Sequence, residues 1–177
     1  MLIVFTGNGK GKTTAALGQA ARTIGRGKNV LMIQWIKGPW KSGEDFIYIK
    51  NKDEDNNGEF KLVKMGLGFV GILGDTLPFE KHKESAQKAL KFFEDELTKN
   101  YWDLLILDEI NVAMSLKLLS VRRVLKSVKK APLNKFIILT GRGAPKSIIK
   151  SADLVTEMKE IKHPFNNGKL AKIALDF

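Results

Sequence analysis

The residues best suited to chemistry form a glycine-rich loop close to the N-terminus. Residues 6–14 read Thr-Gly-Asn-Gly-Lys-Gly-Lys-Thr-Thr and follow a short apolar stretch at residues 2–5. Glycines allow backbone N–H groups to turn inward around an anion, and a lysine adds a mobile ammonium. A threonine hydroxyl can bind a magnesium ion carried by phosphates, and a helix from residue 12 would point its positive end at the same charge. The loop therefore predicts a phosphate-binding site.

The strict phosphate-loop pattern G-x-x-x-x-G-K-[ST] is met only in its second half. Its first position is Thr6 in this chain, whereas Gly11, Lys12 and Thr13 are intact. A glycine-rich turn with incidental lysines is the alternative, but the apolar strand before the loop and the helical pattern after it favour phosphate binding. We expect nine consecutive residues to contact the nucleotide: Thr6, Gly7, Asn8, Gly9, Lys10, Gly11, Lys12, Thr13 and Thr14.

Two adjacent carboxylates form a second candidate site. Asp108 and Glu109 follow the apolar residues 104–107. In phosphate-loop proteins an acidic pair at the carboxyl end of a strand lies beside the loop, where one member holds the metal ion or its water. A solvated acidic turn is the alternative, and the phosphate loop makes it the weaker interpretation. We therefore predict a Mg²⁺ (or Mn²⁺) site made by Thr13, Asp108 and Glu109.

A third feature lies directly beyond another apolar strand. Residues 140–145 read Thr-Gly-Arg-Gly-Ala-Pro and follow the apolar residues 136–139. Ligands of open α/β sheets bind outside the carboxyl ends of the strands, so Arg142 can face a triphosphate and stabilise its charge. A structural strand-to-helix turn with Arg142 in solvent is the alternative. On the first interpretation Lys12, Glu109 and Arg142 are the candidate catalytic residues.

Length and composition predict one domain over residues 1–177. The chain has 177 residues, of which 44% are hydrophobic, and this is enough for a core of its own. The absence of cysteine excludes disulfides, cysteine-based zinc sites and a thiol nucleophile. The apolar run at the N-terminus is too short for a signal peptide or a membrane span, and we expect a cytoplasmic protein without membrane contact.

The net charge of +11 suits anionic ligands and attracts phosphodiester backbones. Arginine, the residue that bidentate base recognition favours, supplies only five of the 30 basic residues, which argues against specific nucleic-acid binding. The densest basic run, at residues 122–130, has the spacing of a solvated helix face. The charge is therefore better explained as attraction of a polyphosphate or another anionic ligand.

Strand and helix patterns alternate along the chain, which predicts an α/β fold with a mostly parallel sheet flanked by helices. The expected strands are residues 2–6, 29–36, 103–107 and 135–140, and the expected helices are residues 12–25 and 79–99. Another helix is expected from a cap at Ser120. Residues 51–58 are expected to form a polar loop between two short strand-like pieces, and residues 153–162 and 169–177 a C-terminal hairpin.

Six short motifs are spread along the chain: GNGKGKTT at 7–14, QWIKG at 34–38, MGLGF at 65–69, LDE at 107–109, TGRG at 140–143 and KHPF at 162–165. They occur in the order found in the ATP:corrinoid adenosyltransferases, and the chain resembles that family essentially end to end. The phosphate loop alone is generic, but its combination with MGLGF and TGRG is specific. The resemblance implies a RecA-like P-loop NTPase core that binds ATP reversed relative to ordinary P-loop enzymes, so that the ribose C5′ faces cobalt.

The resemblance implies a cob(I)yrinic acid a,c-diamide or cob(I)alamin adenosyltransferase. Such an enzyme transfers the 5′-deoxyadenosyl group of ATP to a Co(I) corrinoid and releases tripolyphosphate, in the biosynthesis or salvage of adenosylcobalamin. The resemblance also implies a homodimer and a reduced flavodoxin-like electron donor. It adds Arg22 and Phe69 to the cofactor-binding residues, with Phe69 at the place of an aromatic that displaces the lower axial ligand of the corrinoid. A core side chain is the alternative for Phe69.

Other positions refine this picture. Gly71 stands where the family often has a further aromatic residue. The glycine-rich residues 66–74 are predicted to be a mobile cover, because Co(I) is a strong reductant and its site should exclude water. His82 and His163 are not expected to bind a metal ion, because neither has a partner at ligand spacing.

Two other functions use similar residues. An acidic pair after a strand also occurs in P-loop ATPases that activate water, and a basic RecA-like ATPase can act on nucleic acid. A nucleotide-gated regulatory protein would have the phosphate loop without turnover. The phosphate product distinguishes these functions, because adenosyl transfer releases tripolyphosphate whereas hydrolysis releases orthophosphate.

Overall fold

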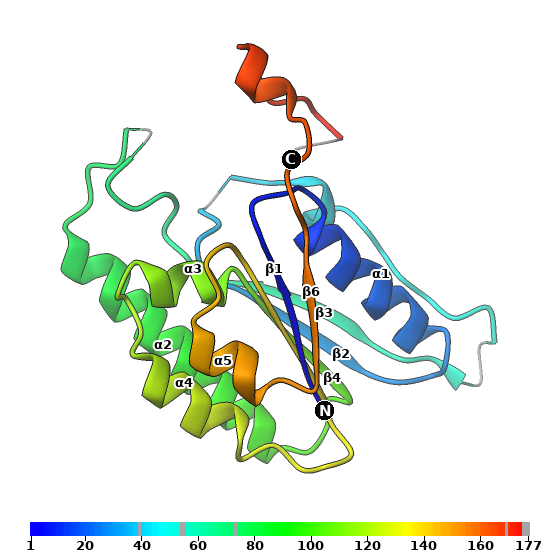
Figure 1. The fold of residues 1–177 in the computed structure, drawn as a ribbon. Coiled ribbons are helices and arrows are strands. Elements are labelled where there is room, and N and C mark those ends of the chain that lie inside the picture. Colours follow the sequence, from blue (N-terminus) through cyan, green and yellow to red (C-terminus); the bar gives the residue numbers. More distant parts are fainter. Residues whose placement is uncertain (39, 54–55, 73, 169, 175–177) are drawn as a thin grey trace.

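The computed structural model describes residues 1–38, 40–53, 56–72, 74–168 and 170–174 (Figure 1). Parts of four sequence-based expectations lie outside the described residues. They are Pro39 in the loop expected after residue 36, residues 54–55 of the polar loop, residue 73 of the glycine-rich segment, and residues 169 and 175–177 of the hairpin.

A six-stranded sheet forms the centre of the domain. All its strands run parallel, in the order β3-β2-β4-β5-β1-β6. The strands are β1 (Leu2–Thr6), β2 (Val30–Gln34), β3 (Phe60–Lys64), β4 (Leu104–Asp108), β5 (Phe136–Thr140) and β6 (Leu154–Glu157). β2 and β4 are buried at every position because helices cover both faces of the sheet, and this explains their continuous apolar sequences.

One helix covers one face of the sheet, and the other α-helices cover the opposite face (Figure 1). The single helix is α1 (Lys12–Ile24), and the others are α2 (Phe79–Thr98), α3 (Ile110–Ser115), α4 (Val121–Val128) and α5 (Lys146–Ser151). Short 3₁₀ turns lie at η1 (Gly43–Asp45) and η3 (Pro164–Asn167). Side chains alternate along β2, so Met32 packs with Ala16 under α1 and Ile33 packs in the cluster that contains Phe93 of α2.

The fold class predicted from the sequence is confirmed: the structure is an α/β domain whose parallel sheet is flanked by helices. The cap at Ser120 is also confirmed, because its hydroxyl accepts the N–H of Arg123 at 3.1 Å. The polar loop at residues 51–58 is followed by β3, but the residues before the loop form η1 and irregular structure instead of a strand. No helix of the described residues is long and apolar enough to cross a membrane.

The predicted C-terminal hairpin is wrong in its first arm. β6 pairs in parallel with β1, with Val4 opposite Val155, and no antiparallel partner lies beside it among the described residues. The physical reason is the connection through α5, which returns the chain to the sheet in the direction of β5. Residues 158–168 and 170–174 contain no strand, and the rest of the expected second arm lies outside the described residues.

Candidate functional site

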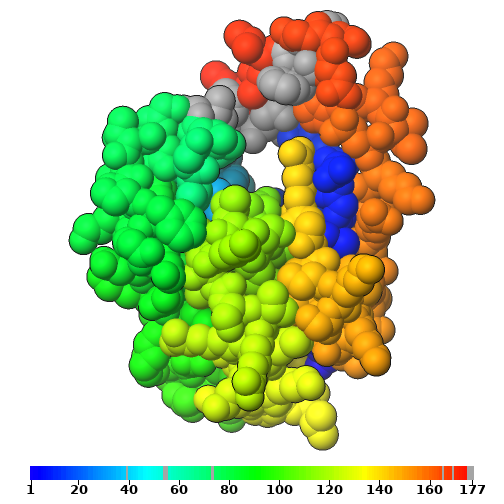
Figure 2. All heavy atoms as spheres, turned by 60° about the vertical axis from the view of Figure 1, so that its left-hand side comes forward, coloured from blue at the N-terminus to red at the C-terminus, as the bar shows by residue number. Residues whose placement is uncertain are grey.

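The phosphate loop, the acidic pair and the TGRG motif meet at one edge of the sheet. They follow β1, β4 and β5, whose carboxyl ends point the same way, and the residues after β3 reach the same edge. Figure 2 shows a hollow between the teal and green residues that follow β3 and the yellow residues that follow β5. Ligands of parallel α/β sheets bind at this edge.

Gly7 and Gly9 of the phosphate loop pack against the chain that leaves β6. The N–H of Gly9 donates to the carbonyl oxygen of Met158 at 2.7 Å. A Cβ atom at Gly9 would lie 2.6 Å from the carbonyl oxygen of Lys159, and a Cβ at Gly7 would clash with the backbone of Met158. These two glycines are therefore required by the close approach of two backbone segments, and the N–H of Gly9 is engaged by the chain after β6.

Lys12 is held at the start of α1 with only 7% of its surface exposed. Its Nζ donates to the carbonyl oxygen of Gly9 at 2.6 Å. Burial lowers the pKa of the Lys12 ammonium, the charge of Glu109 opposes this change, and the charge of Arg142 adds to it. The three predicted catalytic residues therefore come together, although they follow three different strands.

Asp108 is fully buried at the end of β4, and its carboxylate accepts three hydrogen bonds. Its Oδ1 accepts from the Thr140 hydroxyl at 2.6 Å and from the Thr13 hydroxyl at 2.9 Å. Its Oδ2 accepts from the side-chain amide of Gln34 at 3.0 Å. Burial raises the pKa of Asp108, and these hydrogen bonds oppose the change. Asp108 thus fixes the Thr13 hydroxyl at the first turn of α1.

Glu109 adopts a left-handed backbone conformation, with φ at 61°. This conformation costs about 1–3 kcal/mol in a residue with a side chain, and such residues cluster at functional sites. Its N–H donates to the Thr140 hydroxyl at 3.0 Å. Burial and the charge of Asp108 raise the pKa of Glu109 to about 7, although Lys12 and Arg142 act in the opposite direction. A carboxyl group with such a pKa beside a buried lysine is typical of a functional site.

The TGRG turn is shaped around Glu109. Gly141 has φ at 121°, and a Cβ atom there would lie 3.1 Å from Oε2 of Glu109. The same turn is held to β1, because the N–H of Ala144 donates to the Thr6 hydroxyl at 3.2 Å. Arg142 is exposed at the tip, and its charge reaches both Lys12 and Glu109.

Sequence reasoning missed a polar network beside Asp108. The Gln34 amide that donates to Asp108 also donates to Oε1 of Glu44 at 2.9 Å, and Lys37 pairs with the same oxygen. Burial alone would raise the pKa of Glu44, but the hydrogen bonds from Lys37 and Gln34 outweigh it and lower the pKa to about 2. The available signal was Gln34 itself, a polar residue at the end of an otherwise apolar strand.

Phe69 lies in the loop after β3, whose described residues 66–72 and 74 we call the Phe69 loop. Its side chain is 42% exposed, and its ring meets the ring of Trp40 edge to face with 6.2 Å between centroids. Trp40 is itself 57% exposed. Phe69 is therefore not a core side chain, and the two rings form an apolar surface at the ligand-binding edge.

The other side chains predicted to bind the nucleotide are exposed, some beside the phosphate loop and one far from it. Asn8, Lys10 and Thr14 are exposed around the phosphate loop. Arg22 is exposed in the last turn of α1. Ten residues separate it from Lys12, which corresponds to about 15 Å along the helix axis. The structure thus brings the loop, the acidic pair and Arg142 together, and it leaves Arg22 at the far end of the helix.

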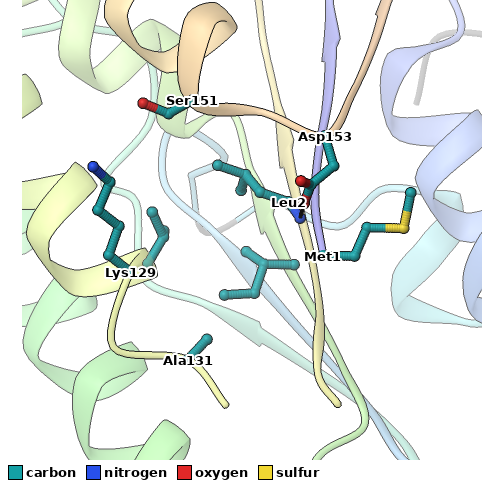
Figure 3. A pocket seen from close by; sticks show the side chains of 8 residues that line it. Met1, Leu2, Lys129, Ala131, Ser151 and Asp153 are labelled. Atoms are coloured by element: carbon teal, nitrogen blue, oxygen red, sulfur yellow. Dashed lines mark hydrogen bonds between the residues drawn. The ribbon is translucent and has the colours of Figure 1, made fainter. Parts of the chain in front are cut away.

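A cavity of about 140 Å³ lies at the opposite, amino edge of the sheet. Figure 3 shows Met1, Leu2 and Asp153 on one side of this cavity, with Lys129 across from them. Asp153 is engaged there in accepting the N–H of Leu2 at 2.6 Å. Since ligands of parallel sheets bind at the carboxyl edge, this cavity is separate from the candidate site.

The comparison with known proteins decides the family. The sequence matches the family model of the ATP:corrinoid adenosyltransferases BtuR/CobO/CobP over residues 1–177. The chain belongs to this family. It is 34% identical to the corrinoid adenosyltransferase of Escherichia coli (strain K12) over 177 residues, which is all of this chain and 85% of that protein.

Other family members show the same similarity. The chain is 34% identical over 177 residues to the corrinoid adenosyltransferase CobA of Salmonella typhimurium (strain LT2), and the match covers 85% of that protein. It is also 34% identical to the corrinoid adenosyltransferase of Pseudomonas aeruginosa (strain PAO1), of which 83% is covered. The resemblance seen in the sequence is confirmed, and the nucleic-acid ATPase and the regulatory protein are not favoured.

Replacement of Lys12 by alanine is expected to weaken ATP binding roughly 10- to 100-fold, because a charge-assisted contact to phosphate is lost. Turnover should be abolished. Titration calorimetry with ATP measures the affinity. Lys83→Ala, which removes an ammonium from the exposed face of α2, is the control and should bind ATP normally. An unchanged affinity in Lys12→Ala would contradict the phosphate-binding role.

Glu44 gives a prediction about pH. Its pKa is about 2 in the folded protein and 4.5 ordinarily, so its contribution to stability is present above pH 4.5 and is lost as the pH falls toward 2. Glu44→Gln should therefore lose less unfolding free energy than the unmodified protein over this range, as urea denaturation at several pH values will measure. Glu84→Gln, in an exposed pair with Lys81, should keep the original pH dependence. Identical slopes for all three proteins would mean that Glu44 titrates normally.

Proposed function

We propose that this protein transfers the 5′-deoxyadenosyl group of ATP to the cobalt of a Co(I) corrinoid and releases tripolyphosphate, in adenosylcobalamin biosynthesis or salvage. The proposal is carried by the full-length family match together with the cluster of Lys12, Glu109 and Arg142 at the ligand-binding edge. Within the corrinoid class, cob(I)alamin and cob(I)yrinic acid a,c-diamide are the substrates that we propose.

The proposed reaction is a displacement at the ribose C5′ of ATP. Cobalt(I) supplies the electron pair of the new Co–C bond, the C5′–O bond breaks, and its electrons leave with tripolyphosphate. Such an attack needs no general base, but the leaving group gains negative charge that must be stabilised. Lys12 and Arg142 are the cations that we assign to this stabilisation, since the charges of both act on Glu109.

Thr13, Asp108 and Glu109 fit a magnesium or manganese ion. Carboxylate and hydroxyl oxygens suit such hard cations, and Mg²⁺ usually binds through one or two carboxylates together with substrate phosphates. The described residues contain no group of three or more His, Cys, Asp or Glu side chains that could hold a metal ion. We propose that the ion is shared with the phosphates of ATP. When bound, the ion would neutralise charge on the triphosphate. Asp108 orients the Thr13 hydroxyl for this role, and Glu109 is the more accessible carboxylate.

The Phe69 loop is suited to the corrinoid because of its place in the sheet. It follows β3, whereas the phosphate loop follows β1, four strands away. This corresponds to about 19 Å at the usual strand spacing, which leaves room for an adenosine and a corrin ring. We assign to Phe69, exposed beside Trp40, the displacement of the lower axial ligand.

We propose that a reduced flavodoxin-like protein supplies the electron that converts Co(II) to Co(I), and that the enzyme works in the cytoplasm as a homodimer. Specific nucleic-acid binding is not part of the proposal. We attribute the net charge of +11 to the attraction of anionic ligands.

Analysis of the phosphate product tests the proposed reaction. The purified protein is incubated with ATP, Mg²⁺ and chemically reduced cobalamin, and the products are separated by ion-exchange chromatography. Adenosylcobalamin and tripolyphosphate should form in equal amounts. Orthophosphate in place of tripolyphosphate, independent of the corrinoid, would indicate an ATPase and would refute the proposal.

The acidic pair gives a prediction about the metal. Glu109→Gln should lower the rate and raise the Mg²⁺ concentration for half-maximal activity about tenfold or more, because a charged oxygen ligand becomes a weaker neutral one. A magnesium titration of the initial rate measures the shift. Glu80→Gln on the exposed face of α2 is the matched control. A shift in Asp108→Asn with none in Glu109→Gln would assign the metal to the other carboxylate.

Phe69→Ala separates two steps of the corrinoid reaction. It should slow the reaction of a corrinoid whose lower base is attached, because cobalt must lose that ligand before it is reduced. Chemically reduced Co(I) has already lost the ligand, so its adenosylation should barely change. Melting temperature should also change little, since Phe69 is 42% exposed.

Phe79→Ala is the control for this experiment, because Phe79 is 44% exposed on α2. It should leave both reactions at the original rate. Equal losses for the two substrates in Phe69→Ala, together with a large fall in melting temperature, would assign Phe69 a structural role and leave the ATP site unaffected.

A further inference from the structure

Both ends of the Phe69 loop are tied to one face of α2. The Ser85 hydroxyl donates to the carbonyl oxygen of Met65, directly before the loop. One turn earlier in the helix, Nε2 of His82 lies 3.0 Å from Oδ2 of Asp75, directly after the loop. Residues three apart on a helix share a face. A helix anchored in the core therefore sets the distance between the two ends of the loop.

Asp75 also organises the second half of the loop. Its Oδ2 accepts the N–H of Gly71 at 2.8 Å, and its Oδ1 accepts the N–H of Leu77 at 3.0 Å. These backbone hydrogen bonds lower the pKa of Asp75, and the contact with His82 lowers it further. Because a carboxylate can only accept, Nε2 of His82 is the donor in their hydrogen bond.

The pair of Asp75 and His82 is shielded from solvent. His82 is 3% exposed, and the side chain of Asp75 is 7% exposed. A buried polar group that loses its hydrogen-bond partner is unfavourable. Truncation of His82 would leave Asp75 without its partner on α2 and would weaken the packing of the loop against this helix. The loop needs such restraint, because Gly68, Gly71 and Gly74 all have positive φ and glycine leaves the backbone conformationally free.

The other half of the loop rests against Trp40. A Cβ atom at Gly68 would lie 2.8 Å from the Trp40 ring, and a Cβ at Gly38 would clash with the same ring. Trp40 therefore fits between two glycines and contacts Phe69 at its edge. Since this contact depends on where the loop lies, the tie between Asp75 and α2 also determines where Phe69 points.

We propose that Asp75 and His82 are positioning residues for Phe69. Their hydrogen bond holds the Phe69 loop on α2, so that Phe69 stands beside Trp40 and meets the lower face of a corrinoid. The two residues act through the loop, and their effect is confined to corrinoids that still carry the lower base. This inference rests on the proposed corrinoid role of Phe69.

Kinetics with two substrates test the proposal. Asp75→Ala and His82→Ala should lower kcat at least tenfold with cobalamin that carries its lower base and is reduced enzymatically. They should leave the KM for ATP and the rate with chemically reduced Co(I) unchanged. His82→Gln should retain most of the activity, because the glutamine amide can donate to Asp75 as the imidazole does. Glu80→Gln on the exposed face of α2 is the control and should match the unmodified enzyme.

Hydrogen–deuterium exchange supplies a readout that does not depend on activity. The amides of Gly71 and Leu77 should exchange at least tenfold faster in His82→Ala, while the amide of Phe93 in the core of α2 keeps its protection. Protection at Gly71 and Leu77 that survives in His82→Ala would overturn the proposal. Faster exchange at Phe93, with equal rate losses for both corrinoids, would also overturn it in favour of a purely structural role.

A double variant distinguishes failure of this inference from failure of the proposed function. If the two positions act as one unit, Phe69→Ala with His82→Ala should be no slower than Phe69→Ala alone. A slow Phe69→Ala beside a normal His82→Ala would overturn the positioning role and leave the function of Phe69 intact. If Phe69→Ala itself reacts normally with both corrinoids, the assigned role of Phe69 fails, and the positioning role fails with it whatever the exchange data show.

Discussion

The buried carboxylate of Asp108 is the interaction on which the site depends. A buried carboxylate is stable only with hydrogen-bond partners, and this one takes them from the first turn of α1, the end of β2 and the end of β5. β5 lies between β4 and β1 in the sheet, so the acidic pair and the phosphate loop are two strand spacings apart, about 10 Å. The hydrogen bond from the Thr13 hydroxyl to Asp108 joins them. Thr140 on β5 holds the acidic pair itself, since its hydroxyl donates to Asp108 and accepts from the N–H of Glu109.

Two charged groups beside Asp108, Lys12 and Glu109, are shifted toward their neutral forms. Burial lowers the pKa of Lys12 and raises that of Glu109 to about 7. A ligand that brings both signs of charge, such as a triphosphate with its divalent cation, would reverse both shifts at once. Reorganisation during the reaction should cost little free energy, because the Lys12 ammonium is already held by the carbonyl oxygen of Gly9 and the backbone of Glu109 by the Thr140 hydroxyl.

The sequence predicted those parts of the site whose residues are adjacent in the chain. The phosphate loop, Asp108 with Glu109, and the turn around Arg142 each follow an apolar strand, and parallel strands bring such positions to one edge. It missed Glu44 and Asp75, because their partners Gln34 and His82 are 10 and 7 residues away in unrelated local patterns. The sequence-based prediction also gave the last strand, β6, the wrong partner. An extended segment does not reveal which strand it pairs with, and β6 pairs in parallel with the free edge of β1.

The packing of Gly7 and Gly9 against Met158 and Lys159 means that the phosphate loop has a structural role in addition to ligand binding. Its glycines would be needed for the chain after β6 to approach β1 even in a protein that had lost ATP. Sequence variation at these two positions therefore reports on the architecture, whereas variation at Lys12 and Thr13 reports on the ligand. A relative that kept Gly7 and Gly9 but lost Lys12 and Thr13 would therefore retain the fold without the residues that bind the phosphates.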